Sequence, residues 1–258
     1  MFEILKIKRF KTPIQISEID DKIVSEVPLT ITLNGEELVT LLCSPAHLKE
    51  LAVGYLTAEG FIDSSGDVNS VLFDEKANII RVNTRKEISE AVINKKRIIT
   101  SGCGRGQSFY HWSDFENCRK IESDFKANAN AILSLMLEFQ KKSLVFMETG
   151  GVHSAALSDD KSIIAFFEDI GRHNAVDKIV GEIILHGGEI KDKILLLSGR
   201  ISSEIVIKAV RLGVPIIVSR SAPTTMAVRL AEKLNISLIG FARGTRMNIY
   251  SGSQRIII

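Results

Sequence analysis

The first half of the chain contains short alternating runs of apolar and polar residues that predict β-strands. "KIVSEVPLTITLNGEEL" predicts two strands joined at Asn34-Gly35, and "VNSVLFDE" and "IIRVNT" predict two more. One helical pattern, "SPAHLKELAVGYLTAEGFI", interrupts them. Ser44 is expected to cap this helix, Pro45 to occupy its first position and Gly60 to end it. The first half therefore reads as an α+β unit.

From Phe125 the pattern changes to alternating helices and continuous apolar runs. "DFKANANAILSLMLEFQKK" places its apolar residues at helical spacing, and further helical patterns cover 174–186, 202–212 and 223–234. The runs between them have the length of buried strands: "SLVFM", "SIIAFFE", "KILLLS", "VPIIVS" and "ISLIGFA". Strands that are apolar on both faces predict a sheet with helices on each side, an α/β domain.

Length and composition favour two domains. The chain has 258 residues, of which 45% are hydrophobic and 25% charged, as in an ordinary soluble globular protein. The change of pattern places the boundary at 114–124, which gives an N-terminal α+β domain over 1–120 and an α/β domain over 121–258.

Charge excludes several classes of partner. With 33 Lys and Arg against 31 Asp and Glu, a net charge of +2 argues against a nucleic-acid or membrane-surface binder. The start, "MFEILKIKRFKTP", lacks the apolar segment of a secretory signal, and no run reaches the length of about 20 residues that spans a membrane.

Three cysteines leave at least one thiol free or intermolecular. We expect a cytoplasmic protein.

Arginines follow the predicted strands. Ligands of such sheets gather where strands end, and guanidinium groups suit phosphate. Caps and turns explain any one of these loops, but together they predict an anion or nucleotide pocket. The arginines beyond strand ends are Arg172, Arg200, Arg220 and Arg243, with Arg246 close by.

Metal and phosphate-loop motifs are absent from the sequence. His153 and His173 are more simply hydrogen-bonded structural imidazoles than metal ligands, because the zinc deaminase signature, H-E-x-x-H and paired C-x-x-C are all missing. There is no Walker A sequence and no G-x-G-x-x-G. We expect no metal site.

Cys103 lies in the stretch "TSGCGRGQ", residues 100–107. Flanking glycines let the backbone turn and approach a ligand, while Arg105 and backbone N–H groups favour the nucleophilic thiolate. Cys43 after "LVTLL" fits a small buried apolar residue, and the same interpretation is open for Cys118. The sequence therefore predicts a reactive thiol at Cys103.

Six motifs in this order resemble the FdhD/NarQ family of formate dehydrogenase accessory proteins: the cysteine loop, "TGGVHSAAL", "EDIGRHNAVDK", "LSGRISSE", "SRSAPTTMAVRLA" and "GFARGTRMNIY". The resemblance implies a sulfurtransferase that accepts sulfur from a cysteine desulfurase and passes it to the bis-guanine-dinucleotide molybdenum cofactor of formate dehydrogenase. It also implies a cytidine-deaminase-like three-layer C-terminal domain, a smaller N-terminal domain and a homodimer.

The family's persulfide-forming cysteine matches Cys103, and Gly106 stands where a second cysteine often follows. The family's cofactor-binding F-C-R-x-x-R pattern matches Phe241, Ala242, Arg243, Gly244, Thr245 and Arg246. The remaining residues expected around the cofactor, or a mimic such as GDP, are Gly150, Gly151, His153, Gly171, Arg172, His173, Arg200 and Arg220.

Two other functions fit the same residues. A cysteine hydrolase would combine Cys103 with His153 or His173 and an acid such as Asp169. A cofactor chaperone would bind and deliver the dinucleotide without moving sulfur. Without a second cysteine in the loop, sulfur must pass directly to the metal or be released by another thiol, such as an external one or Cys118.

Overall fold

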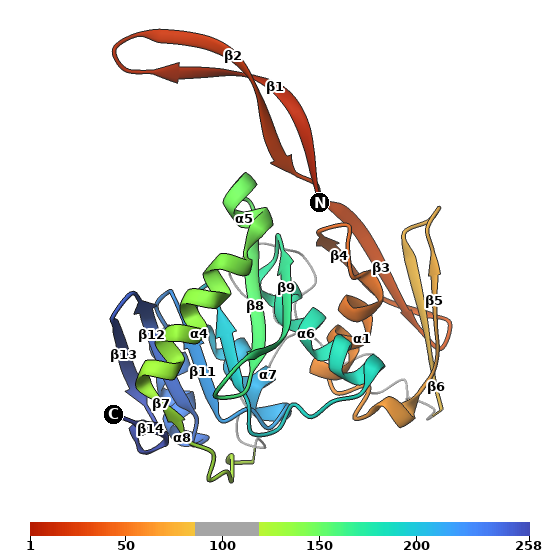
Figure 1. Cartoon of the computed structure of the whole chain (residues 1–258). Helices are drawn as coiled ribbons and strands as arrows, with labels where there is room; N and C mark the ends of the chain where they lie inside the picture. The colour runs from red at the N-terminus through yellow and green to blue at the C-terminus, as the bar shows by residue number, and fades with distance from the viewer. Residues whose placement is uncertain (86–118) are drawn as a thin grey trace.

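The computed structural model describes residues 1–85 and 119–258 and contains an N-terminal part, a larger C-terminal part and a projecting hairpin (Figure 1). The predicted reactive loop around Cys103, with Gly106 and Cys118, lies outside the described residues. Separate apolar cores form in the two parts. The division at residue 120 stays a prediction.

The N-terminal part is a four-stranded sheet covered by one helix. Leu29, Ile31 and Leu33 alternate along β3 and are buried against the helix. Asn34 and Gly35 both have positive φ, as a tight hairpin turn requires, so the predicted hairpin is confirmed. In sheet order the strands are β4 (Glu36–Cys43), β3 (Val27–Leu33), β6 (Ile79–Thr84) and β5 (Val68–Asp74). The helix is α1 (Leu48–Ala58), and a 3₁₀ turn, η1 (Ser65–Asp67), precedes β5.

Helix α1 ends where predicted but begins later. Gly60 has φ +83°, and the N–H groups of Gly60 and Phe61 donate to the carbonyls of Thr57 and Leu56, which closes a Schellman motif. Ser44 does not cap the helix, and Pro45 lies before its first turn. The hydroxyl of Ser44 instead accepts from Ile170 N, so this residue joins the two parts of the chain.

The C-terminal part is a three-layer α/β domain, which confirms the predicted fold class. Strands β10, β11 and β12 are parallel, and β8 runs antiparallel to β10. In sheet order the strands are β13 (Arg246–Ser251), β12 (Ser237–Arg243), β11 (Ile216–Ser219), β10 (Ile194–Leu197), β8 (His153–Ser158) and β9 (Ile163–Asp169).

Helices cover both faces of this sheet, as the apolar runs predict. Along β10, Ile194 and Leu196 pack on the side of α4, whereas Leu195 and Leu197 pack against the helices of the opposite face. Those elements are α4 (Ala129–Lys142) on one face, and α6 (Arg172–His186), α7 (Ser203–Arg211) and α8 (Thr225–Lys233) on the other. Smaller elements are β7 (Ala127–Asn128), β14 (Ile256–Ile257) and η2 (Ser253–Arg255).

The run "SLVFM" is not a strand, which corrects the sequence prediction. It forms the short helix α5 (Leu144–Thr149), whose first N–H groups, from Val145 and Phe146, donate to the Glu168 carboxylate at 3.0 Å. A five-residue apolar run has no period that separates strand from helix. The strand at this point of the sheet is β8, which begins at His153.

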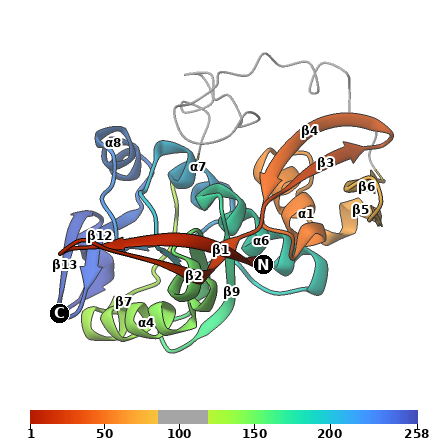
Figure 2. The same ribbon diagram turned by 90° about the horizontal axis from the view of Figure 1, so that it is seen from above.

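Two glycines let the N-terminal and C-terminal parts touch backbone to backbone. A Cβ on Gly54 of α1 would lie 1.7 Å from Asp177 O, and one on Gly181 of α6 would lie 1.8 Å from Glu50 O. No larger residue fits either position without moving a helix. The close packing of α1 on α6 (Figure 2) thus fixes the N-terminal part against the sheet domain.

Residues 1–24 form a long hairpin that the sequence interpretation did not foresee. Strands β1 (Phe2–Lys11) and β2 (Gln15–Val24) pair along their whole length and rise away from the body (Figure 1). We call this hairpin the amino-terminal arm.

Candidate functional site

A cavity of about 430 Å³ lies where several strands of the large sheet end. Parallel β10, β11 and β12 end at the same edge, β9 also ends there, and antiparallel β8 begins there. Helices α4 and α5 supply the opposite wall. The lining residues are Phe139, Gln140, Ser143, Phe146, Gly150, Gly151, Val152, His153, Ser154, Ile170, Ser198, Arg220 and Arg243.

Arg220 and Arg243 form the basic wall of the cavity. Arg243 Nε donates to Arg220 O at 2.8 Å, and its guanidinium carbon lies 5.8 Å from the centre of the Phe241 ring. Phe241 has φ +52°, an uncommon conformation that its N–H stabilises by donating to Ser221 O at 3.1 Å. The turn after β12 therefore holds Arg243 beside Arg220.

Arg220 has an unused hydrogen-bond donor. Its Nε is buried and has no partner among the described residues. Partial burial, then the charge of Arg243, lower the pKa of Arg220 below its usual value. A guanidinium stays protonated even so. Buried donors without acceptors are costly, so an anion between Arg220 and Arg243 would satisfy both the donor and the two like charges.

Hydroxyl groups and an imidazole also line the cavity. Ser198 Oγ accepts from Ser154 N at 2.9 Å and lies 3.4 Å from His153 Nδ1, while the hydroxyls of Ser143 and Ser154 lie 2.9 Å apart. Burial, followed by the charges of Arg172 and Arg200, lowers the pKa of His153. Neutral His153 can accept or donate one hydrogen bond to a ligand.

The structure brings together only some of the predicted binding residues. Gly150, Gly151, His153, Arg220 and Arg243 line the cavity. Arg172 and Arg200 lie close enough to lower the pKa of His153. Gly244, Thr245 and Arg246 are exposed in the β12–β13 turn. Ala242 is buried in the core on the α4 side.

His173 and Gly171 lie elsewhere. His173 is buried, and its Nε2 is 3.2 Å from Glu204 Oε2 of α7. Burial, followed by the charges of Lys208 and Arg172, holds the pKa of His173 well below its usual value. Gly171 precedes α6, and a Cβ there would come within 2.9 Å of Asn174 Nδ2.

Sequence reasoning missed the wall formed by α4 and α5. Phe139, Gln140 and Ser143 come from the end of α4, and Phe146 from α5. Ser154 and Ser198 were not singled out either. Because "SLVFM" was taken as a strand, nothing indicated that this segment folds over the strand ends.

Asp169 does not serve as a catalytic acid in this arrangement. Its Oδ1 accepts from Gly171 N and Asn174 Nδ2, and its Oδ2 accepts from Ser44 N and, at 2.6 Å, from Lys178 Nζ. The fully buried carboxylate has no acceptor site left to orient a histidine. The structure thus excludes Asp169 as the acid of a cysteine hydrolase.

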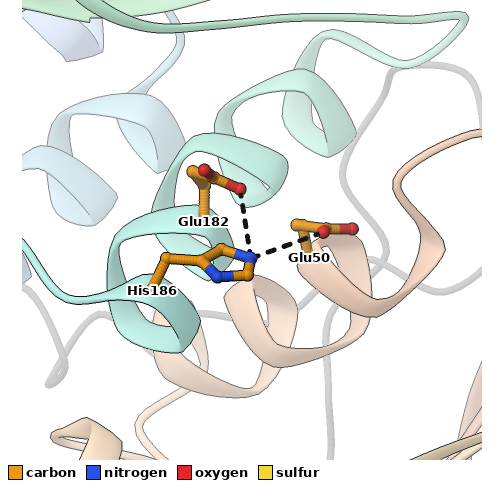
Figure 3. Close-up of side chains that lie close together, drawn as sticks. All are labelled: Glu50, Glu182 and His186. Atoms are coloured by element: carbon orange, nitrogen blue, oxygen red, sulfur yellow. Dashed lines mark ion pairs between the residues drawn. The ribbon is translucent and has the colours of Figure 1, made fainter.

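A second polar cluster lies where α1 and α6 cross (Figure 3). His186 Nε2 is 3.6 Å from Glu182 Oε2 and 4.0 Å from Glu50 Oε1. Within the described ranges, this is the group of three side chains whose potential ligand atoms all lie within 4.8 Å. His186 is 61% exposed, and the contacts are ion pairs that link the helices when His186 is protonated.

No helix in residues 1–85 or 119–258 is long and apolar enough to span a membrane. The fold and cavity define a three-layer α/β protein with an arginine-walled cavity at its strand ends. The model of the FdhD/NarQ family matches residues 24–257, so the chain belongs to this family.

Relatives match nearly the whole chain. "Sulfur carrier protein FdhD" of Bacillus subtilis (strain 168) is 42% identical over 243 residues, covering 94% of this chain and 93% of the relative. The protein of the same name from Listeria innocua is 44% identical over 260 residues, covering 97% of both. A crystal structure from Desulfotalea psychrophila, described as a formate dehydrogenase accessory protein, has a TM-score of 0.81 at 25% identity and 99% coverage of both chains.

Proposed function

We propose that the chain is a sulfurtransferase that delivers sulfur to the bis-guanine-dinucleotide molybdenum cofactor before the cofactor enters formate dehydrogenase. Two relatives are named sulfur carrier proteins, and a structural relative is described as a formate dehydrogenase accessory protein. We further propose a cysteine desulfurase as sulfur donor, a cytoplasmic location and a homodimer.

The unpaired, buried Nε of Arg220 beside Arg243 carries the cofactor part of the proposal. A cavity of about 430 Å³ falls in the range of small-molecule sites and suits one nucleotide end of the cofactor, with its phosphates toward the arginines. Backbone at Gly150 gives a ligand close access, because no Cβ projects there and no described atom lies within 4 Å of that position. The cofactor is cargo in this scheme and is not held permanently.

Sulfur chemistry is assigned to Cys103. Its thiolate attacks the terminal sulfur of the donor's persulfide, the donor cysteine leaves as a thiolate, and Cys103 carries the persulfide. Release of that sulfur as sulfide needs a thiol that attacks the inner sulfur and forms a disulfide with Cys103. Since Gly106 replaces the second cysteine of the loop, Cys118 or an external thiol takes this role.

Cys43 provides an internal control for this assignment. It is buried, and desolvation, together with Asp169, raises the pKa of its thiol to about 12. A thiol that stays protonated at neutral pH is a poor nucleophile. Sulfur loading should therefore be insensitive to Cys43→Ser.

Mass spectrometry tests the proposal. The protein is incubated with a cysteine desulfurase and cysteine, digested without reductant, and searched for a gain of one sulfur atom. We expect the gain on the peptide that contains Cys103, in wild type and in Cys43→Ser. Sulfur on no peptide, together with retained GDP binding, would instead favour the cofactor chaperone.

A further inference from the structure

The amino-terminal arm has few contacts with the body and projects from it. Its base is held where Lys22 Nζ binds Glu148 Oε1 at 2.8 Å and where Val24 lies against Gly151, a cavity residue. Beyond this base the arm extends past the body (Figure 1) and, seen from above, crosses the large sheet (Figure 2). Ten residues per strand give a length of about 33 Å, enough to cross a small domain.

The arm exposes apolar side chains on both of its faces. Residues opposite each other in an antiparallel pair share a face, so Phe10 and Ile16 lie together on one face, and Leu5 lies on the other. Phe10 is 59% exposed, Ile16 67%, and Ile14 in the turn 87%. An isolated two-stranded hairpin is marginally stable in water, and exposed apolar clusters mark contact surfaces. The arm therefore needs a partner surface.

A second exposed apolar surface lies on α4 and α5. We define this α4–α5 patch as Leu137, Leu144, Phe146 and Met147, which are 54%, 62%, 43% and 60% exposed. Phe146 also lines the cavity, so the patch continues into the cavity rim. The chain thus carries two apolar surfaces, and the tip of its arm points away from its body (Figure 1).

We infer that the arm of each chain lies on the α4–α5 patch of a second copy, so that two arms are exchanged across a twofold axis. This inference specifies the surfaces of the homodimer in the proposed function and rests on that part of it. A twofold exchange makes the same contact twice and leaves neither surface open. Each arm would border the partner's cavity through Phe146.

Charge also favours a second copy over a charged partner. Residues 1–24 hold five basic side chains (Lys6, Lys8, Arg9, Lys11, Lys22) and four acidic ones (Glu3, Glu18, Asp20, Asp21), a net charge of +1. Lys6 lies opposite Asp20, and Lys8 opposite Glu18, so the charges balance across the hairpin. The arm therefore lacks the basic excess that nucleic acid or an anionic membrane would select.

Sedimentation of the full chain tests the exchange. Phe10→Lys with Ile16→Lys, or Leu144→Lys with Met147→Lys, should each weaken dimerisation at least tenfold, because each pair places charges in the apolar contact. Leu72→Lys is the control, since Leu72 is 58% exposed on β5, outside both surfaces. These side chains are exposed within the chain, so circular dichroism of the variants should match wild type.

Cross-linking separates exchange from an arm folded back on its own chain. In a Cys103→Ser, Cys118→Ser background, Ile14→Cys chains are mixed with larger, tagged Leu144→Cys chains and treated with a short bis-maleimide. Exchange predicts a product that contains one chain of each kind. The exchange would be overturned if cross-links formed only within single chains of an Ile14→Cys, Leu144→Cys double variant, at the mass of a monomer. It would also be overturned if the wild-type protein were a monomer, or if the lysine variants left the dimer unchanged. Sulfur loading of wild type is measured separately, so those results would leave the sulfurtransferase assignment standing.

Discussion

Two charged regions of the sheet domain differ in how completely their groups are paired. Around α6, Asp169 of β9 binds Lys178, and Asp177 binds Lys208 of α7 at 2.5 Å, all of them buried. At the strand ends, Arg220 keeps a buried donor without a described partner and Arg243 is exposed. The first region is closed and holds the parts of the protein together, whereas the second is open to a ligand.

Breaking the closed region should have the largest effect. Asp169→Ala leaves Lys178 buried without its carboxylate and removes acceptors from Ser44 N and Gly171 N, so the free energy of unfolding should fall by about 3–5 kcal/mol. Denaturant unfolding measures this loss. Glu138→Ala removes an exposed pair with Lys142 and should cost only about 0.3–0.5 kcal/mol. Equal losses would contradict the difference between closed and exposed pairs.

Removing an arginine from the cavity should weaken ligand binding and leave folding intact. Arg220→Ala or Arg243→Ala should weaken GDP binding by about 1.5–3 kcal/mol, roughly 10- to 150-fold, because each removes a charge-assisted hydrogen bond. Calorimetry at fixed salt gives the affinity. Arg229→Ala, on the exposed face of α8, removes the same charge away from the cavity and serves as the control. GDP affinity untouched by both cavity variants would argue against the site.

Acid should destabilise the fold through His173. The pKa of His173 in the folded protein lies well below the value of about 6.5 expected in the unfolded chain. Unfolding therefore takes up a proton, and the free energy of unfolding decreases as pH falls below about 6.5. The loss from this group approaches at most about 1.4 kcal/mol per pH unit. Burial raises the pKa of Asp177 to about 6, which acts in the opposite direction in this range. Denaturant unfolding at several pH values, compared between wild type and His173→Gln, isolates the histidine, and identical pH profiles would refute its role.

Arg246→Ala should have the smallest effect. Arg246 lies opposite Arg243 in the strand register at the exposed β12–β13 turn, and it is not among the described residues that line the cavity. A charge in solvent contributes little, so GDP affinity should fall by less than about 1 kcal/mol. Titration of the Arg243→Ala and Arg246→Ala proteins with GDP under the same salt conditions compares the contributions of the two residues to GDP affinity. A larger loss for Arg246 would move the phosphate position toward the turn.

The layers of the fold were predictable because local pattern and burial agree. Apolar runs such as "KILLLS" formed strands covered on both faces, and Asn34-Gly35 formed the turn that its chemistry requires. The short helix α5 was not predictable, because its start depends on Glu168, a residue distant in sequence. The arm was missed since its apolar residues alternate with charges and face no core of their own chain.

The candidate site was predictable only at its strand ends. Arginines after parallel strands meet at one edge for topological reasons, which places Arg220 beside Arg243. Sequence alone treated His153 and His173 alike. Their surroundings differ because α7 brings Glu204 to His173, whereas Ser198 and the cavity adjoin His153.

Sulfur loading and GDP affinity, measured together on Cys103→Ala, test most directly whether sulfur chemistry and cofactor binding belong to separate residues. The substitution removes the thiol of the glycine loop and leaves every described side chain of the cavity in place. We predict no sulfur gain after incubation with a desulfurase and cysteine, with GDP affinity equal to that of wild type. A Cys103→Ala protein that gains sulfur as wild type does would contradict the assignment.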